Sequence, residues 1–457
     1  MAYQARRTGW RAGVLAMGLA LTAMAAPARA ETLADALISA YRQSNLLEQN
    51  RAVLRATDED VAGAIAALRP VFAFVADSGY ARTVQTSGYS ASIGLSASLS
   101  LFDSGRSRLS VLIAQETVLA TREALVQVEQ GVLLDAVSAY FDVRSALESV
   151  AINENSVRVI GEELRAAEDR FEVGEVTRTD VALAEAQLAA ARASAAAASG
   201  SLSVAREAYK AATGHYPATL APAPPTPALP ATLEEAKAIA LRTHPSVREA
   251  QRQVTVSELQ VRLAAAQRGP NVDASVQAGR NDNGQDTMSA GVSMSQTLYS
   301  GGSLSSLHRQ AIASRDSSRA ALLQAGVTIG QSVGEAWSNI AVARAQISAT
   351  EEQIRAATAA YEGVREEANL GARTTLDVLD AEQDLLDARA SRIDAEASLQ
   401  VSIYSLLASM GLLTAEHLNL GIPTYDPAAY YEAVKNAPPT STQGKSLDRV
   451  LRAIGKE

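Results

Sequence analysis

The sequence contains an internal duplication, which limits its possible folds more than any other feature. Residues of the first half recur in the second half, 200 positions later near the start of each half and 197 positions later towards its end. These residues and their repeats are Thr32/Thr232, Leu33/Leu233, Pro70/Pro270, Gly174/Gly371, Asp180/Asp377 and Gly214/Gly411. We therefore expect two copies of one structural unit and not two unrelated domains.

The repeat divides the chain into five segments. We expect an export signal in residues 1–30, a first repeat in 31–216, a proline-rich linker in 217–230, a second repeat in 231–411, and an equatorial segment with a tail in 412–457. In each repeat a helix should precede a strand hairpin and then a long helical hairpin. The prolines between the repeats favour a stiff, extended connection.

The first 30 residues have the parts of an export signal: a positive start at Arg6, Arg7 and Arg11, a short apolar run, and small residues at a cleavage site. Four of the 41 basic residues and none of the 50 acidic residues lie there, so the mature chain carries 37 basic residues against 50 acidic ones, or −13. This balance argues against a nucleic-acid partner. The chain has no cysteine, which excludes disulfides and lipid attachment through an N-terminal cysteine.

Two stretches without proline, residues 71–216 and 271–422, allow unusually long elements. Within the first, apolar residues recur at spacings of three, four or seven, as in a coiled coil. We expect long helical hairpins over 104–213 and 303–410, whose first helices would each reach about 100 Å at about 1.5 Å per residue. On this feature alone, a long solvated bundle or filament is the alternative.

Each long helix is expected to end at a glycine, and the returning helix to begin at a threonine. Gly174 and Gly371 suit the left-handed conformation that ends a helix. Thr177 and Thr374 each precede an aspartate by three positions, which is the pattern of a capping box. The sequence therefore predicts tight turns between antiparallel helices in both repeats.

A second periodicity, with apolar residues at every other position, predicts strand hairpins over 71–102 and 271–299 that turn near 86–88 and 281–285. Alternating strands of about ten residues suit a membrane barrel, and a soluble antiparallel sheet with one wet face is the alternative. Four strands cannot close a barrel, whereas two copies would give eight and three copies twelve. Four aromatic residues near the strand ends are candidates for the membrane interface: Tyr80, Tyr89, Phe102 and Tyr299.

These features resemble the TolC-type outer-membrane factors from about residue 32 to residue 412. The resemblance is carried by the repeat and by four segments: LFDSG at 101–105, AYFDV at 139–143, LYSGG at 298–302 and GARTTLDVLDA at 371–381. It implies a mixed fold, a trimer whose 12-stranded transmembrane β-barrel continues into a long periplasmic α-helical barrel. It also implies outer-membrane lipid, a periplasmic adaptor and an inner-membrane transporter, ATP-driven (ABC type) or proton-driven (RND type), as partners.

Carried over residue by residue, the resemblance places Asp377 and Asp380 at a constriction of the pore, on the helix that lines the periplasmic mouth. Three further residues match positions that hold this mouth shut through polar links: Thr179, Asp180 and Arg373. The sequence departs from the family pattern at Ala368, where the best-known member carries a tyrosine. The closed state would therefore be held by fewer bonds.

Signals for chemistry are weak. Residues 330–334 read GQSVG, like the nucleophile elbow of hydrolases, but that motif needs a strand before it and this copy lies inside a helical pattern. The four histidines have no metal-ligand spacing: His215, His244, His308 and His417. We therefore expect no cofactor, no metal site and no enzymatic activity.

The predicted function is a passive exit duct in the outer membrane, reaching into the periplasm and opened there by its partners. Its cargo would be small molecules or proteins exported in one step (type I secretion). The alternative is a trimeric structural or adhesive stalk without a transport role. The predicted turns favour the duct, because a stalk has little reason to double back at its tip.

Overall fold

The computed structural model describes residues 30–82, 87–436, 445 and 449 of the 457-residue chain. The expected export signal therefore lies outside the described residues except for Ala30, as does most of the expected tail. The elements in chain order are α1 (Leu33–Gln43), α2 (Asn45–Ala66), β1 (Val71–Arg82), β2 (Ser87–Phe102), α3 (Arg106–Glu172), α4 (Arg178–Thr213), α5 (Leu233–Thr243), α6 (Pro245–Ala266), β3 (Asn271–Asn281), β4 (Asp286–Ser295), α7 (Ser303–Asn369), α8 (Thr375–Ser409) and α9 (Pro427–Val434).

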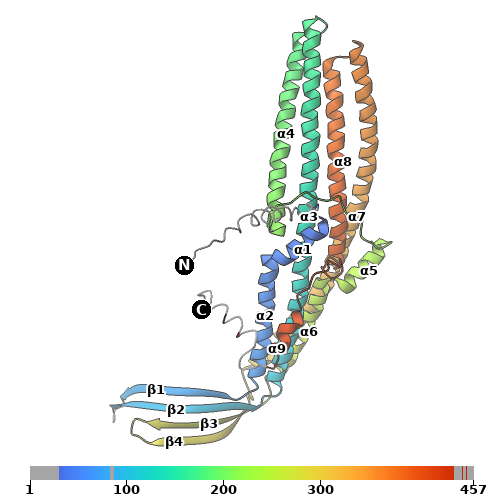
Figure 1. The fold of residues 1–457 in the computed structure, drawn as a ribbon. Coiled ribbons are helices and arrows are strands. Elements are labelled where there is room, and N and C mark those ends of the chain that lie inside the picture. Colours follow the sequence, from blue (N-terminus) through green and yellow to red (C-terminus); the bar gives the residue numbers. More distant parts are fainter. Residues whose placement is uncertain (1–29, 83–86, 437–444, 446–448, 450–457) are drawn as a thin grey trace, which may run out of the picture.

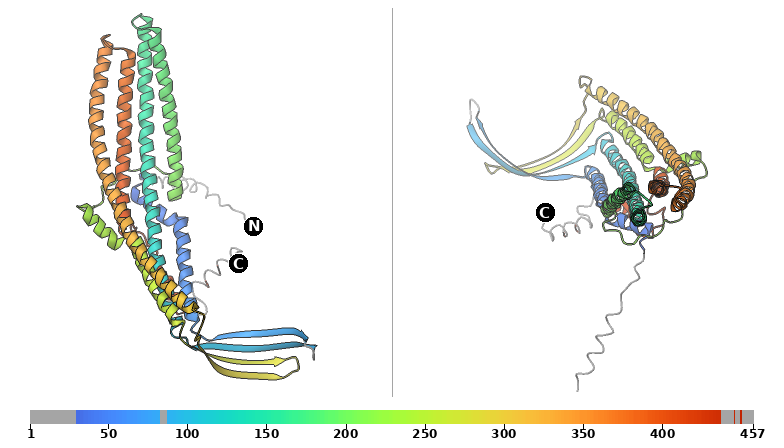
Figure 2. Two further views of the ribbon diagram at one scale, coloured as in Figure 1. Left: turned by 180° about the vertical axis from the view of Figure 1, so that it is seen from behind. Right: turned by 90° about the horizontal axis from the view of Figure 1, so that it is seen from above.

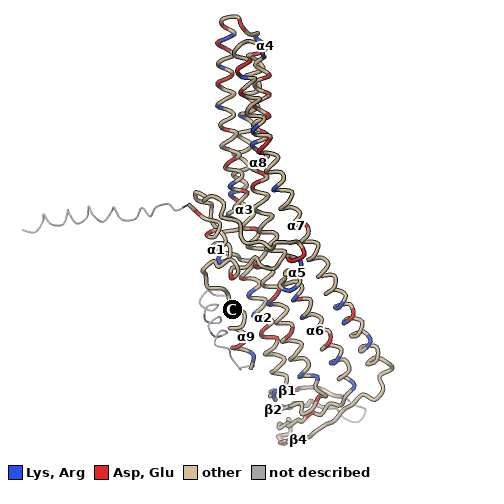
Figure 3. The backbone as a smooth tube through the Cα atoms, turned by 90° about the vertical axis from the view of Figure 1, so that its right-hand side faces the viewer, with Lys and Arg blue, Asp and Glu red and all other residues tan. Residues whose placement is uncertain are grey.

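Two long helical hairpins, α3–α4 and α7–α8, run side by side and end together at one tip, while the four strands project from the other end (Figure 1). The helices α3 and α7 each contain 67 residues, which corresponds to about 100 Å. Charged residues are distributed along the helices (Figure 3). Among the described residues, no helix is both long and apolar enough to cross a membrane.

Helix α3 begins at Arg106, two residues later than expected from Ser104. Ser104 and Gly105 have positive φ angles of 58° and 82°, so they form a left-handed corner before the helix. The carboxylate of Asp103 then accepts hydrogen bonds from the amides of Gly105 (2.9 Å) and Ser107 (2.6 Å). Asp103 thus caps the first turn of α3 and joins it to β2.

The expectation of one helix before each strand hairpin was wrong, because the structure contains two in each repeat. Ser44 separates α1 from α2 and His244 separates α5 from α6, both in extended conformation. The Ser44 hydroxyl and His244 Nδ1 each accept a hydrogen bond from an amide of the following helix, and Pro245 occupies a first-turn position where its missing N–H is not needed. The C-terminal helix α9 was also not expected.

The strands form one antiparallel sheet in the order β1-β2-β3-β4, and the sheet curves when seen from above (Figure 2). The pairing aligns Phe74 with Leu95, Leu95 with Ala278 and Ala278 with Met288, so the apolar rows of all four strands share one face. The turn between β3 and β4 spans residues 282–285, as expected. The earlier turn lies partly outside the described residues, and Ser87 and Gly88 belong to β2.

The linker is fixed to the helices by a buried polar network around Glu31. The Tyr209 hydroxyl donates to Glu31 Oε1 at 2.6 Å, His215 Nε2 lies 2.8 Å from the same oxygen, and the Ala218 amide donates to Glu31 Oε2 at 3.1 Å. A parallel bridge joins Glu31 to Leu220. The chain between the repeats is therefore held against the largest core, where the shorter helices meet the four long helices α3, α4, α7 and α8.

Candidate functional site: the helical tip

Both hairpins turn at the tip by the same device. Gly174 and Gly371 have φ angles of 83° and 77°, which glycine adopts without strain. The amide of Glu175 donates to the carbonyl of Arg170, and the amide of Ala372 donates to that of Glu367, both at 2.9 Å. These bonds across five residues satisfy carbonyls that a helix end would otherwise leave unpaired.

Both returning helices begin with the expected capping box. Thr177 and Asp180 exchange hydrogen bonds at the start of α4, as do Thr374 and Asp377 at the start of α8. In the second box the Asp377 carboxylate accepts from the Thr374 amide and hydroxyl, both at 2.9 Å. These bonds, with the nearby Arg373 guanidinium, lower the pKa of Asp377, so this carboxylate stays ionised at neutral pH.

The other residues expected in the gate lie exposed around these caps. Arg373 Nε is 2.8 Å from Glu367 Oε2, so within one chain this guanidinium pairs with its own hairpin. Asp380 is exposed one helical turn after Asp377, and Thr179 is exposed on α4. The structure thus brings Arg373 close to Asp377, while Asp180 serves its own cap.

The two hairpins contact each other just behind the turns. Leu379 of α8 is buried against Ile160 of α3 and against Ala184 and Leu188 of α4. Glu382, one turn further along α8, is also buried. Sequence reasoning missed Glu382, although it stands between Leu379 and Leu385 at a position where the apolar seam continues.

Large apolar side chains are exposed at the outermost part of the tip. Val173 and Leu370, the residues before the two turn glycines, are 71% and 85% exposed. Phe171 and Leu376 are also exposed. The tip therefore combines carboxylates with apolar side chains that nothing in a single chain covers.

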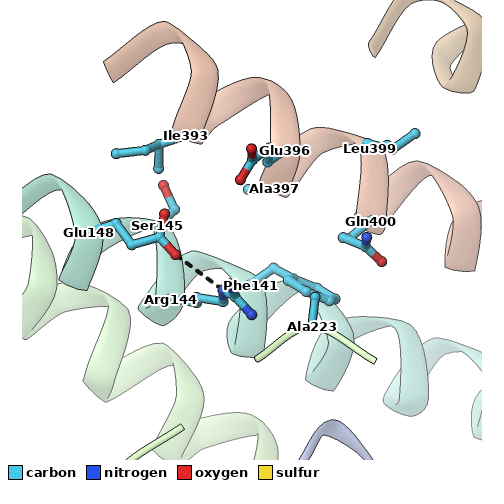
Figure 4. A pocket seen from close by; sticks show the side chains of 10 residues that line it. All are labelled: Phe141, Arg144, Ser145, Glu148, Ala223, Ile393, Glu396, Ala397, Leu399 and Gln400. Carbon is cyan, nitrogen blue, oxygen red and sulfur yellow. Dashed lines mark hydrogen bonds and ion pairs between the residues drawn. The ribbon is translucent and has the colours of Figure 1, made fainter. Parts of the chain in front are cut away.

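Other candidate sites have simple structural explanations. The GQSVG segment lies within the continuous helix α7, not on a turn after a strand. A cavity of about 130 Å³ lies between α3, α8 and Ala223 of the linker (Figure 4). Its charged residues have partners: Arg144 pairs with Glu148 at 3.2 Å, and Glu396 pairs with Arg392 at 2.8 Å. Among the described residues, no group of three or more His, Cys, Asp or Glu side chains is arranged to hold a metal ion.

The antiparallel sheet has one apolar face and is continuous with two long helical hairpins. This arrangement is typical of one class of protein, the outer-membrane channel-tunnels. The outer membrane efflux protein family matches this chain twice, over residues 37–215 and 238–412, once in each repeat. The outer membrane efflux protein BepC of Brucella suis biovar 1 is 35% identical over 433 residues, which cover 93% of this chain and 94% of BepC. TolC of Escherichia coli is 26% identical, covering 80% of this chain and 79% of TolC.

Solved structures share the fold. A crystal structure of CusC matches with a TM-score of 0.75 at 19% identity and covers 84% of this chain and 92% of CusC. The chain belongs to the outer membrane efflux protein family. It is an outer-membrane efflux channel protein that extends into the periplasm, and its relatives give no support to the structural stalk. The family consists of channels and not of enzymes.

Proposed function

We propose that three copies of this chain assemble into one closed efflux duct. The observation that carries this proposal is the sheet, in which β1 and β4 each have a neighbour on one side within the chain. A membrane tolerates no open sheet edge, and three copies of four strands would form a closed barrel of twelve. The apolar face shared by all four strands would contact lipid.

The tip is the proposed gate of this duct. In a trimer, Asp377 and Asp380 would place six carboxylates around the narrow periplasmic end, and such rings favour cations over anions. Arg373 and Asp180, with Thr179 beside it, would contribute polar links between neighbouring copies that resist opening. The exposure of Asp380 and Arg373 in the single chain supports this role.

The apolar side chains of the tip are the proposed docking site for a periplasmic adaptor. Val173 and Leu370 are large, exposed and placed at the turns, where a second protein can reach them. An ATP-driven or proton-driven transporter of the inner membrane would deliver cargo through this junction. The duct itself would be passive, and its partners would open it.

Mass measurement of the mature protein in detergent tests the assembly. We expect a trimer of the mature chain that resists extraction from membranes by salt. A stable, soluble monomer would contradict the proposal. Planar-bilayer recordings test the duct, because a closed barrel with a narrow tip should give small, cation-selective single-channel currents.

A further inference from the structure

Glu382 is a buried carboxyl group at the contact between the two helical hairpins. Its exposed fraction is 8%, and its Oε2 atom has no hydrogen-bond partner. It lies one turn behind Leu379, in the layer that joins α8 to α3 and α4. A buried carboxylate without full pairing is costly, so a carboxyl group at this place favours its neutral, protonated form.

The groups around Glu382 come from three helices. Glu163 of α3 faces it and is itself mostly buried, with 16% of its side chain exposed. From α7, the Tyr361 hydroxyl is hydrogen-bonded to Glu382, and the Arg365 guanidinium lies 3.6 Å from Glu163. Arg389 follows on α8 itself. Two carboxyl groups thus meet in a mostly buried contact, with two partly exposed arginines, Arg365 and Arg389, nearby.

The duplication provides an internal comparison. The offset of 197 residues makes Glu185 of α4 the counterpart of Glu382, and the segments AEAQL at 184–188 and AEQDL at 381–385 correspond. Glu185 is exposed whereas Glu382 is buried. The same residue type therefore experiences two environments in one chain, and the buried copy lies at the contact that separates if the hairpins move apart.

We propose that Glu382 carries a proton when the tip is closed, and that its ionisation beside Glu163 loosens the contact between the two hairpins and favours an open tip. This inference rests on the proposed gate. It adds a proton-binding residue that lies behind the gate residues and positions the helix that carries them.

The direction of the pH effect follows from the two environments. Burial, and then the charge of Glu163, raise the pKa of Glu382 from 4.5 to about 7 in the closed contact. Hydration on opening would return the pKa toward 4.5. The closed contact is therefore strongest below about pH 4.5 and weakens as the pH rises toward 7. Each pKa unit released on opening changes the ratio of open to closed channels about tenfold.

Single-channel recordings of the purified full-length protein between pH 5 and pH 8, at constant salt, test this proposal. We expect the open-to-closed ratio of the unaltered channel to rise about tenfold or more over this range. Glu382→Gln should keep the ratio near its value at pH 5, whereas the matched variant Glu185→Gln should behave like the unaltered channel. An unchanged pH dependence in Glu382→Gln would overturn the inference.

Two further variants should shift the pH of the opening transition in opposite directions, which a purely structural role of Glu382 would not produce. Glu163→Gln removes the like charge and should move the transition to lower pH, whereas Tyr361→Phe removes a bond to the carboxylate and should move it to higher pH. If Glu382→Gln does not assemble, Glu163→Gln and Tyr361→Phe test the proposal in its place. Equal or absent shifts of the transition in these two variants would overturn it. If neither the unaltered protein nor any variant forms channels, that result would instead contradict the proposed function.

Spin labels provide a second readout that does not depend on conductance. The chain has no cysteine, so single cysteines can be introduced at the turns as Glu175→Cys and Ala372→Cys. We expect the distance between the labels to be longer or more widely distributed at pH 8 than at pH 5, and this difference to vanish when Glu382→Gln is added. Identical distances at both pH values in the unaltered background would also overturn the proposal.

Discussion

Placing an arginine on one face of strand β2 or on the other tests whether the apolar face of the sheet contacts lipid. Leu95 is the ninth of the sixteen residues of β2, so it lies near the middle of the barrel wall. It is 65% exposed in the single chain, and its cross-strand partners Phe74 and Ala278 share its apolar face. An arginine on the lipid face near the midplane costs roughly 2 to 4 kcal/mol, hence about 6 to 12 kcal/mol in a trimer with three copies.

Ser96 is the matched control, because it lies at almost the same depth and points to the other face. We expect Leu95→Arg to reduce folded trimer in urea titrations from lipid vesicles, and Ser96→Arg to shift the midpoint much less. The difference between the two midpoints, multiplied by the slope of the titration, gives the free-energy difference directly. Equal losses for both variants would refute the assignment of the faces.

Four further changes address the gate, the sheet and the linker. Asp380→Ala should weaken cation preference, measured as a smaller reversal potential in a salt gradient, without loss of trimer. Arg373→Glu should raise the resting conductance in planar bilayers, because a polar link that resists opening is replaced by repulsion. Gly279→Val should lower the yield of trimer on native gels, since a Cβ at this position would lie 2.7 Å from the carbonyl oxygen of Ile93. Tyr209→Phe removes the 2.6 Å hydrogen bond to the buried Glu31, which keeps only His215 and the Ala218 amide from this network, and the thermal midpoint should fall by an amount that corresponds to about 1 to 3 kcal/mol.

Much of the fold could be predicted because its signals are local. Proline-free stretches permit long helices, and a glycine followed by a threonine with an aspartate three residues later specifies a turn and a cap together. The alternation in β2 sets which side chains share a face, and the pairing of Leu95 with Ala278 then follows from matching apolar rows. These features depend on neighbours within a few residues or on one adjacent strand.

The features that sequence reasoning missed depend on the arrangement of distant elements. A glutamate on a helix is usually a solvated residue, and Glu185 shows this outcome. Glu382 is buried because α3 and α7 cover it, and a single sequence does not show which helices will do so. The breaks at Ser44 and His244 did have local signals, namely a hydroxyl cap and Pro245. A one-residue break between consecutive helices is nevertheless harder to recognise than a turn that reverses the chain.

The duplication also separates the two aspartates at the mouth of the proposed pore. Asp377 corresponds to Asp180, and both complete capping boxes, so the folding of the hairpin is enough to explain an aspartate at each position. Asp380 corresponds to Leu183 under the same offset, and the first repeat forms its helix without a carboxylate there. Because the fold does not require Asp380, its exposed charge is the stronger sign of a role in conduction. A loss of cation preference should therefore follow Asp380 more closely than Asp377, whose replacement also removes a cap.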